Sequence, residues 1–258
     1  GVDARGRVVG APSPSLETII APAGGVALSL SSGSGAIVVS GCFFSSPSSL
    51  GSGVVEGSSA VLQNLDFREN HVRVETGAQG AAFSMGTSAI NATLSKNVFE
   101  AAAASVHTLF LDGAGTYDGF HFIENEILRA GPVAHHGLFV DGNRNLGTSA
   151  LRSSLIQGNS LIGHEFGFFA GARSLEEVII SGNHFQGNVS GMVGGPKDCQ
   201  LSGNQWTGNS RCGLELTGGG ELLDPSYGAQ GATINGNTFS GNGTLGGPGA
   251  RADLIATW

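Results

Sequence analysis

Charged residues are scarce in this chain: they make up 12% of its 258 residues, and only two of them, Lys96 and Lys197, are lysines. The net charge is −8, which argues against a nucleic-acid partner, because neutralising phosphates requires a basic face. No apolar run approaches the length of a membrane-spanning helix, so no span is expected. The acidic balance fits a neutral glycan, an acidic glycan bridged by cations, or no partner at all.

Cysteine is also scarce, with three residues that leave at least one thiol unpaired. Cys42 is expected to be a small buried hydrophobe, and Cys199 and Cys212 are candidates for a disulfide in an exported protein. Glycine is abundant instead, with 44 residues but without the three-residue period of collagen. Glycine at this density predicts many tight turns with positive φ.

A short phrase recurs along the chain: an apolar residue, two mostly polar residues, a pivot that is usually asparagine, and an apolar residue two places further on. Six copies have the pivots Asn97, Asn125, Asn159, Asn183, Asn204 and Asn237, and two degenerate copies place Cys42 and Leu65 at the pivot. The pivots lie 21 to 34 residues apart. Such repeats are typical of arrays in which each unit buries its apolar face against its neighbours.

Alignment on the pivot yields apolar columns five and three residues before it and two residues after it, and this period of two predicts strands. A further strand recurs between pivots, as in Thr108 to Asp112 and Gly137 to Asp141. We therefore predict an all-β fold: a single-stranded right-handed parallel β-helix of about eight coils with three short strands per coil. Residues 37–258 form this helix, and residues 1–36, with Pro12, Pro14 and Pro22, form an irregular N-terminal segment and cap.

The pivot asparagines are predicted to form a ladder, one per coil, in which amides bond to each other along the axis. Asparagine also tolerates the left-handed backbone region that a sharp turn requires. Hairpin turns of an antiparallel sandwich are the alternative source of Gly-Asn pairs, but they do not generate three apolar columns in phase.

These repeats resemble the right-handed parallel β-helix superfamily of pectate lyases, polygalacturonases and alginate epimerases, from about Ile37 to Ala256. The resemblance is specific for the fold and unspecific for activity. It implies a polysaccharide groove along the outer face of the first strand of each coil. It also implies, for the lyases, a basic residue above the groove, and Arg144 lies near a strand end.

An outward file of aromatic residues is predicted on that strand at Phe110, Phe139 and Phe168, one ring per coil. Exposed rings are unusual unless something covers them, and sugar faces stack on such rings. Two interpretations stay open, since the file either binds a glycan or lies beneath the loops that follow each strand. Glu215 and Arg144 join the file as predicted substrate-binding residues.

Asp112 and Asp141 are predicted to lie one coil apart on the same face, about one strand spacing from each other. Two carboxylates at that separation share a proton, bind a cation such as calcium, or act as acid and base. The alternative is that each accepts hydrogen bonds from its own glycine-rich turn. His107 and His136 enter the same strands as further catalytic candidates, with Glu165 at the position equivalent to His136.

The sequence thus indicates an exported protein, extracellular, on the cell surface or periplasmic, that binds or processes a polysaccharide. Turnover would make it a polysaccharide lyase or glycoside hydrolase, and the sequence leaves turnover open, together with a metal site at His135, His136 and His164. The alternative function is a structural or adhesive stalk of a surface protein without catalysis.

Overall fold

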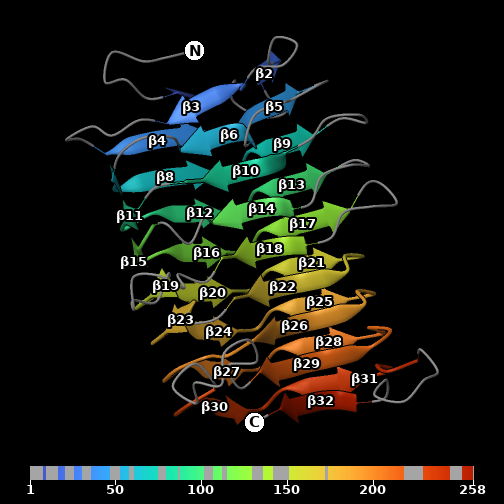
Figure 1. Ribbon diagram of the computed structural model, residues 1–258. Coiled ribbons are helices and arrows are strands. Elements are labelled where there is room, and N and C mark those ends of the chain that lie inside the picture. Colours follow the sequence, from blue (N-terminus) through green and yellow to red (C-terminus); the bar gives the residue numbers. More distant parts are fainter. Residues whose placement is uncertain are drawn as a thin grey trace.

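The computed structural model describes residues 8–9, 17–20, 26–30, 36–46, 53–57, 61–74, 80–86, 88–101, 107–111, 115–129, 136–141, 151–171, 174–217, 229–244 and 252–257. These residues form a right-handed parallel β-helix whose coils stack along one axis from the N-terminal to the C-terminal end (Figure 1). Every strand pairing in the described part is parallel, and each strand pairs with the corresponding strands of the coils before and after it. The predicted fold class is therefore confirmed.

Three long sheets, which we name A, B and C, form the walls, with nine strands each among the described residues. Sheet A consists of β1 (Val8–Val9), β4 (Ile37–Ser40), β8 (Leu65–Arg68), β12 (Thr93–Ser95), β16 (His121–Ile123), β20 (Leu155–Gln157), β24 (Ile179–Ser181), β27 (Gln200–Ser202) and β30 (Thr233–Asn235). Sheet B consists of β2 (Glu17–Ile20), β5 (Cys42–Ser46), β9 (His71–Val74), β13 (Val98–Ala101), β17 (Glu126–Arg129), β21 (Ser160–Ile162), β25 (His184–Gln186), β28 (Gln205–Thr207) and β31 (Thr238–Ser240).

Sheet C contains the strands that the sequence identified between pivots. Its members are β3 (Leu28–Leu30), β6 (Gly53–Gly57), β10 (Ala81–Met85), β14 (His107–Leu111), β18 (His136–Val140), β22 (Phe166–Ala170), β26 (Ser190–Gly194), β29 (Cys212–Thr217) and β32 (Ala252–Thr257). A short sheet D, which was not predicted, adds a fourth strand to five coils: β7 (Leu62–Gln63), β11 (Ala89–Ile90), β15 (Tyr117–Asp118), β19 (Leu151–Arg152) and β23 (Leu175–Glu176). Among the described residues, no helix has the length and apolar character that crossing a membrane requires.

The N-terminal segment is more regular than the sequence suggested. Within residues 1–36, β1, β2 and β3 pair in parallel with β4, β5 and β6 respectively. Each of the three long sheets thus gains a strand from a segment that we expected to be irregular. Its three prolines lie outside the described residues, and the proposed boundary at residue 37 and the role as a cap stay predictions.

The core lies inside the coils and is built from in-register columns. One column runs Val39, Phe67, Leu94, Phe122, Ile156, Ile180, Leu201 and Ile234 across sheet A. Phenylalanine rings continue from coil to coil, with Phe67 and Phe99 stacked at 6.3 Å and Phe99 and Phe122 at 6.2 Å. All of these side chains except Ile234 are fully or almost fully buried, and stacked aromatic pairs stabilise the core beyond the area that they bury.

One degenerate copy of the phrase was assigned to the wrong residues. The true pivot of that coil is Asn70, because Phe67 pairs with Leu94 in sheet A, and Asn70 bonds to Asn97. Leu62 belongs to the short sheet D instead. The extra strand, absent from the three-strand scheme, moved the alignment by five residues.

The asparagine ladder runs unbroken from Asn70 to Asn237. Each Nδ2 before the last donates to the Oδ1 of the next asparagine, at 2.9 to 3.2 Å. Each also donates to a backbone carbonyl of the preceding coil, as Asn159 does to Phe122 at 2.8 Å. The left-handed residue is the one before the asparagine, for example Glu124 at φ 54° or Gly182 at φ 62°. Our assignment of the positive φ to the pivot was wrong, and the asparagine serves the ladder alone.

Candidate functional site

The outer face of sheet C carries two parallel columns of aromatic rings across three coils. His107, His136 and Phe166 lie in register in one column, and Phe110, Phe139 and Phe169 lie in register in the other. All six side chains are half-buried, whereas the residues between them face the core. We call this set of six residues the aromatic patch.

Two successive inward residues separate the two columns in all three strands, and the first of them is a glycine in β18 and β22 and Thr108 in β14. In β18 and β22 the first ring is followed by Gly137 or Gly167 and then by a core residue, so two successive residues face inward between the rings. A Cβ at Gly137 would lie 2.5 Å from the carbonyl oxygen of Gly167 and 2.9 Å from Cδ2 of His164. The bare glycine therefore lets the backbone of the next coil and the ring of His164 approach closely.

The six rings contact one another continuously along the axis. Phe110 and Phe139 stack with centroids 5.6 Å apart and planes 24° apart, and Phe139 and Phe169 stack at 5.3 Å and 12°. His107 stacks on Phe110 at 5.1 Å and on Phe139 at 4.3 Å. These contacts turn part of each ring face toward its neighbours, so the patch presents ring rims together with the remaining faces.

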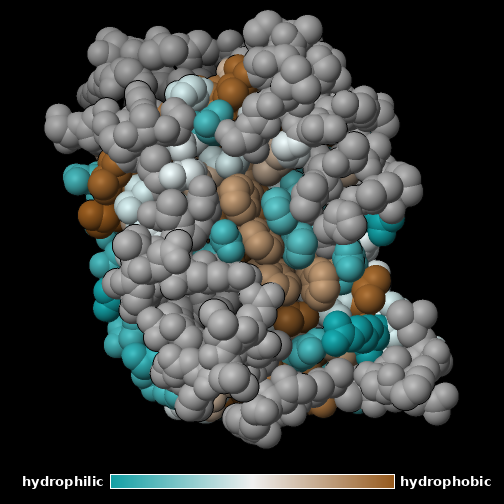
Figure 2. Space-filling model, in the orientation of Figure 1, coloured by the Kyte–Doolittle hydropathy of each residue, from teal (hydrophilic) through white to brown (hydrophobic). Residues whose placement is uncertain are grey.

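The second column is tied to the first by histidine and phenylalanine contacts. His136 lies 4.8 Å from His107, 4.8 Å from Phe139 and 5.2 Å from Phe166, measured between ring centroids. Phe166 and Phe169 complete the set with an edge contact at 5.4 Å. Seen from this side, a band of hydrophobic residues runs down the middle of the face with hydrophilic residues beside it (Figure 2).

The outward residues of sheet C are no longer aromatic on either side of the aromatic patch. Toward the N-terminus the outward column continues as Ser84 and Glu56, and toward the C-terminus as Val193 and Glu215. Glu215 is almost buried and forms an ion pair with Arg211 at 3.0 Å. The nearby thiol of Cys212 lies 3.9 Å from a carboxylate oxygen of Glu215. Burial, as the main cause, raises the pKa of Cys212. This thiol is therefore not an activated nucleophile.

The predicted file of rings was correct at Phe110 and Phe139 but wrong at Phe168. Phe168 is fully buried and pairs with Leu138 in the core, and Phe169 takes the outward position. The prediction aligned β22 on Ala170-Gly171 at its C-terminal end, whereas the strands are in register at the internal Gly137 and Gly167. For the same reason Phe166, not Glu165, is the equivalent of His136.

The predicted acidic pair cannot be assembled from the described residues. Asp112 and Arg144 lie outside them. Asp141 follows β18 and is half-buried, and its backbone N–H donates to the carbonyl of Leu111 at 2.9 Å. The separation of the two carboxylates, their catalytic roles and a calcium ion between them therefore stay predictions. Within the described part of the chain, no group of three or more His, Cys, Asp or Glu side chains is arranged to hold a metal ion.

His164 has a structural position that the sequence did not suggest. It heads a second ladder at the turn from sheet B to sheet C, followed by Asn188, Asn209 and Asn242. Nε2 of His164 lies 3.4 Å from the carbonyl of Ile127, where Nδ2 of Asn188 contacts the equivalent carbonyl of Leu161 at 3.0 Å. The recurring apolar-x-Gly-Asn phrase at Phe185 to Asn188 is the signal that could have revealed this ladder.

The second ladder removes His164 from the proposed three-histidine metal site. Its side chain is buried, and burial, as the main cause, lowers its pKa from 6.5 to about 4. The bond to the Ile127 carbonyl opposes this shift, and Arg129 and His136 add to it. His135 lies outside the described residues, and among the described members of that set His136 belongs to the half-exposed face.

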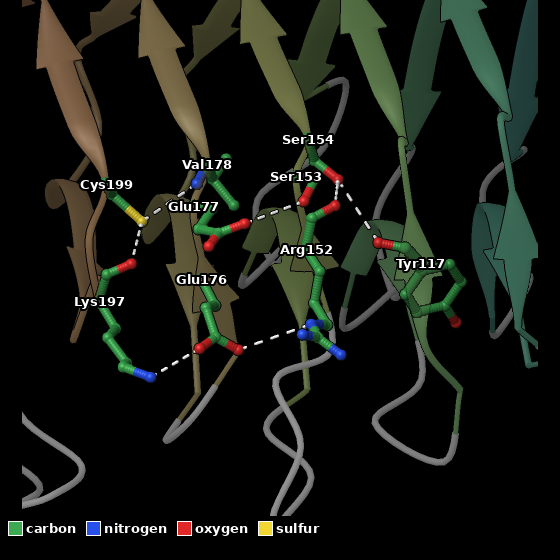
Figure 3. A network of polar contacts seen from close by, with 9 residues as sticks. All are labelled: Tyr117, Arg152, Ser153, Ser154, Glu176, Glu177, Val178, Lys197 and Cys199. Atoms are coloured by element: carbon green, nitrogen blue, oxygen red, sulfur yellow. Dashed lines mark hydrogen bonds and ion pairs between the residues drawn. The ribbon is translucent and has the colours of Figure 1, made fainter.

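The charged residues beside sheet D form a surface network away from the aromatic patch. Glu176 lies between Lys197, at 2.6 Å, and Arg152, at 3.6 Å, and Ser153 donates to Glu177 at 3.1 Å (Figure 3). The groups belong to neighbouring coils and pair with each other, as expected for a solvated ladder of modest stabilising effect. We assign this network a structural role.

Cysteines contribute no cross-link among the described residues. Cys199 lies at the turn before β27 and its thiol donates to the carbonyl of Lys197 at 3.1 Å (Figure 3), whereas Cys212 begins β29 in sheet C. All three cysteines are buried and none forms a disulfide, so the pairing that the sequence left open for Cys199 and Cys212 is not formed. Burial raises the pKa of Cys199 to about 11, and the expected small hydrophobic role of Cys42 agrees with its full burial.

Comparison with known proteins gives a remote structural likeness. No family model and no curated protein matches the sequence. Two solved structures that resemble the fold are A-modules of mannuronan C-5 epimerases from Azotobacter vinelandii. The AlgE6 module is 17% identical, and the alignment covers 97% of this chain and 83% of that chain with a TM-score of 0.46. The AlgE4 module is 14% identical, and the alignment covers 98% of this chain and 86% of that chain with a TM-score of 0.44. Likeness at this level does not assign an activity, and the fold assignment stands on the strand pairing.

Proposed function

We propose that this protein binds an extended polysaccharide along the outer face of sheet C, with the aromatic patch as the main contact surface. The observation that supports this proposal most is the patch itself, which has six partly exposed rings, continuous over three coils, on one face of the helix. Exposed contiguous apolar surface marks interaction sites. One aromatic pair per coil repeats at the strand spacing, which is close to the length of one hexose unit in an extended chain.

The composition of the patch favours sugars over other apolar ligands. Ring rims and partial faces contact the C–H groups of a pyranose, while the imidazoles of His107 and His136 supply polar groups that hydroxyls can bond. No carboxylate or lysine belongs to the patch, so a neutral sugar backbone fits it without desolvating a charge. The proposal includes export, since extended polysaccharides occur mainly outside the cell.

Catalytic turnover is a separate extension of this proposal. It assigns Asp112, Asp141, His107 and His136 to the chemistry and a calcium ion to the two aspartates, with Arg144, Glu165 and Glu215 beside the ligand. Supporting it are the position of the two histidines within the patch and the position of Asp141 directly after β18. New reducing ends or unsaturated products during a binding assay would distinguish an enzyme from a binding protein.

Replacing Phe139 by alanine is expected to weaken polysaccharide binding at least tenfold. Phe139 contacts four of the other five rings of the patch. A stacked ring contributes on the order of 1–3 kcal/mol to a ligand contact. Binding is measured by affinity electrophoresis or calorimetry against a panel of neutral and acidic glycans.

Phe43 supplies the matched control. It lies on the outer side of sheet B, is half-buried, and contacts His71 at 4.8 Å, so Phe43→Ala removes a similar ring outside the patch. That variant should bind as the unmodified protein does. Equal binding by all three proteins, or no binding to any glycan in the panel, would favour the stalk interpretation and overturn the proposal.

A further inference from the structure

The outer face of sheet C is open along three successive coils and closed on both sides of them. In β14, β18 and β22 the first and fourth residues are half-buried, and these are the six rings of the aromatic patch. All five residues of β10 and all five of β26, which pair with β14 and β22 at the two ends of the patch, are buried. A strand whose inner and outer side chains are all buried is covered on both faces.

The closure is thicker on the C-terminal side of the patch. The outward columns continue there as Ser190 and Val193 in β26 and then as Cys212 and Glu215 in β29, and all four side chains are buried. Glu215 is the most informative of them, because a glutamate on an open sheet face extends into water, whereas this one is 8% exposed. Its ion pair with Arg211 at 3.0 Å supplies the partner that a covered carboxylate requires.

The closure on the N-terminal side is one coil thick. Ser84, the register partner of Phe110, is 2% exposed, and Glu56, one coil further along the same column, is half-buried again. An extended glycan chain that lies on the rings would therefore meet covered surface at both ends of the patch. The open length is three strand spacings, about 14 Å, which holds about three hexose units.

A site of this shape favours the end of a chain over its middle. An inner segment of a polymer continues in both directions and requires an open path at both ends, and the covered coils block both paths. The terminal units of a chain require one exit only, which the solvent side of the patch provides. We propose that the aromatic patch binds the terminal units of a glycan chain, about three of them, and excludes inner segments. This inference rests on the proposed function and adds to it which part of the polysaccharide is bound.

The number of protein molecules on each glycan chain distinguishes the two binding modes. The nine strands of sheet C, at about 4.8 Å each, make the coil stack about 43 Å long. A protein that lay along an inner segment would therefore cover about nine hexose units, and a chain of about 40 units would hold about four proteins. Because the two ends of a glycan chain differ chemically, binding at one kind of end gives one protein per chain at any length.

The experiment uses size-fractionated samples, with about 10 and about 40 units, of a glycan that binds in the panel. An excess of the unmodified protein is added to each sample, and sedimentation velocity with light scattering gives the mass of the complex. We expect one protein per chain at both lengths. Phe43→Ala should give the same ratio, and Phe139→Ala should lose the complex with both samples.

The possible outcomes separate this inference from the proposed function. A ratio that rises with chain length, toward about four proteins on the longer chain, would overturn end binding and leave the proposed polysaccharide contact in place. A ratio of one that survives in Phe139→Ala would also overturn the inference, because the bound end would then lie elsewhere. If no glycan in the panel binds the unmodified protein, both proposals fail together.

Discussion

Replacing Asn159 by alanine is expected to lower the free energy of unfolding by about 4 kcal/mol, since each buried polar group left without its partner costs roughly 1–3 kcal/mol. Asn159 lies in the middle of the ladder and is fully buried. Its Nδ2 donates to the carbonyl of Phe122 at 2.8 Å and to Oδ1 of Asn183 at 2.9 Å. Its Oδ1 accepts from the backbone N–H and from Nδ2 of Asn125. Alanine removes all four bonds at once.

Urea unfolding followed by far-ultraviolet circular dichroism measures this loss. Asn235→Ala is the control, because Asn235 is exposed on the outer side of β30, and surface substitutions of this kind change stability by about 0.5 kcal/mol or less. A loss below about 1 kcal/mol for Asn159→Ala would show that the ladder contributes little net stability, and that the apolar columns alone hold the coils together.

Replacing His164 by asparagine is expected to remove a pH-dependent loss of stability. The pKa of His164 is about 4 in the folded protein and 6.5 as its ordinary value, so the unfolded chain takes up the proton first as the pH falls. The group's contribution is fully present above pH 6.5 and is lost between pH 6.5 and about 4. Linkage gives a loss of about 2 kcal/mol between pH 7.5 and pH 5.

Asparagine suits this position because the three residues below it in the second ladder are already asparagines. Their Nδ2 groups contact the carbonyls of Leu161, Phe185 and Trp206, as His164 contacts Ile127. His164→Asn should therefore keep the bond without a titrating group. The free energy of unfolding is measured from pH 7.5 to pH 5 for the unmodified protein, His164→Asn and His184→Gln, the last controlling for loss of an imidazole from the surface. Parallel profiles for the unmodified protein and His164→Asn would contradict the expectation.

The fold could be predicted because its determinants are local and repeated. An asparagine at the pivot of seven successive coils, from Asn70 to Asn237, and apolar residues at fixed offsets from it can be recognised in the sequence without knowing what lies between. Asn70 was missed because the first coils depart from the phrase and carry the unanticipated strand β7. The left-handed residue was misplaced because Glu69, Lys96 and Glu124 give no sign in the sequence that they adopt positive φ.

The site was predicted less completely because it depends on register between coils separated by loops of different length. Phe110 and Phe139 occupy the same place in two strands of similar sequence pattern, β14 and β18, and were placed correctly. Phe169 was missed because the inward pair Gly167 and Phe168 breaks the alternation, and only the close approach of Gly167 to the next strand reveals it. Aligning the strands on their internal glycine, from Gly137 to Gly213, would have selected Phe166 and Phe169.

The most direct test of the proposed function is a titration of the unmodified protein with oligosaccharides of increasing length, taken from any glycan that binds in the panel. If the ligand lies along the aromatic patch, affinity should rise with each added sugar until the chain spans the three coils that carry rings, and then level off. Phe139→Ala should flatten this rise. Affinity that does not depend on length, or a length dependence unchanged in Phe139→Ala, would contradict binding along the outer face of sheet C.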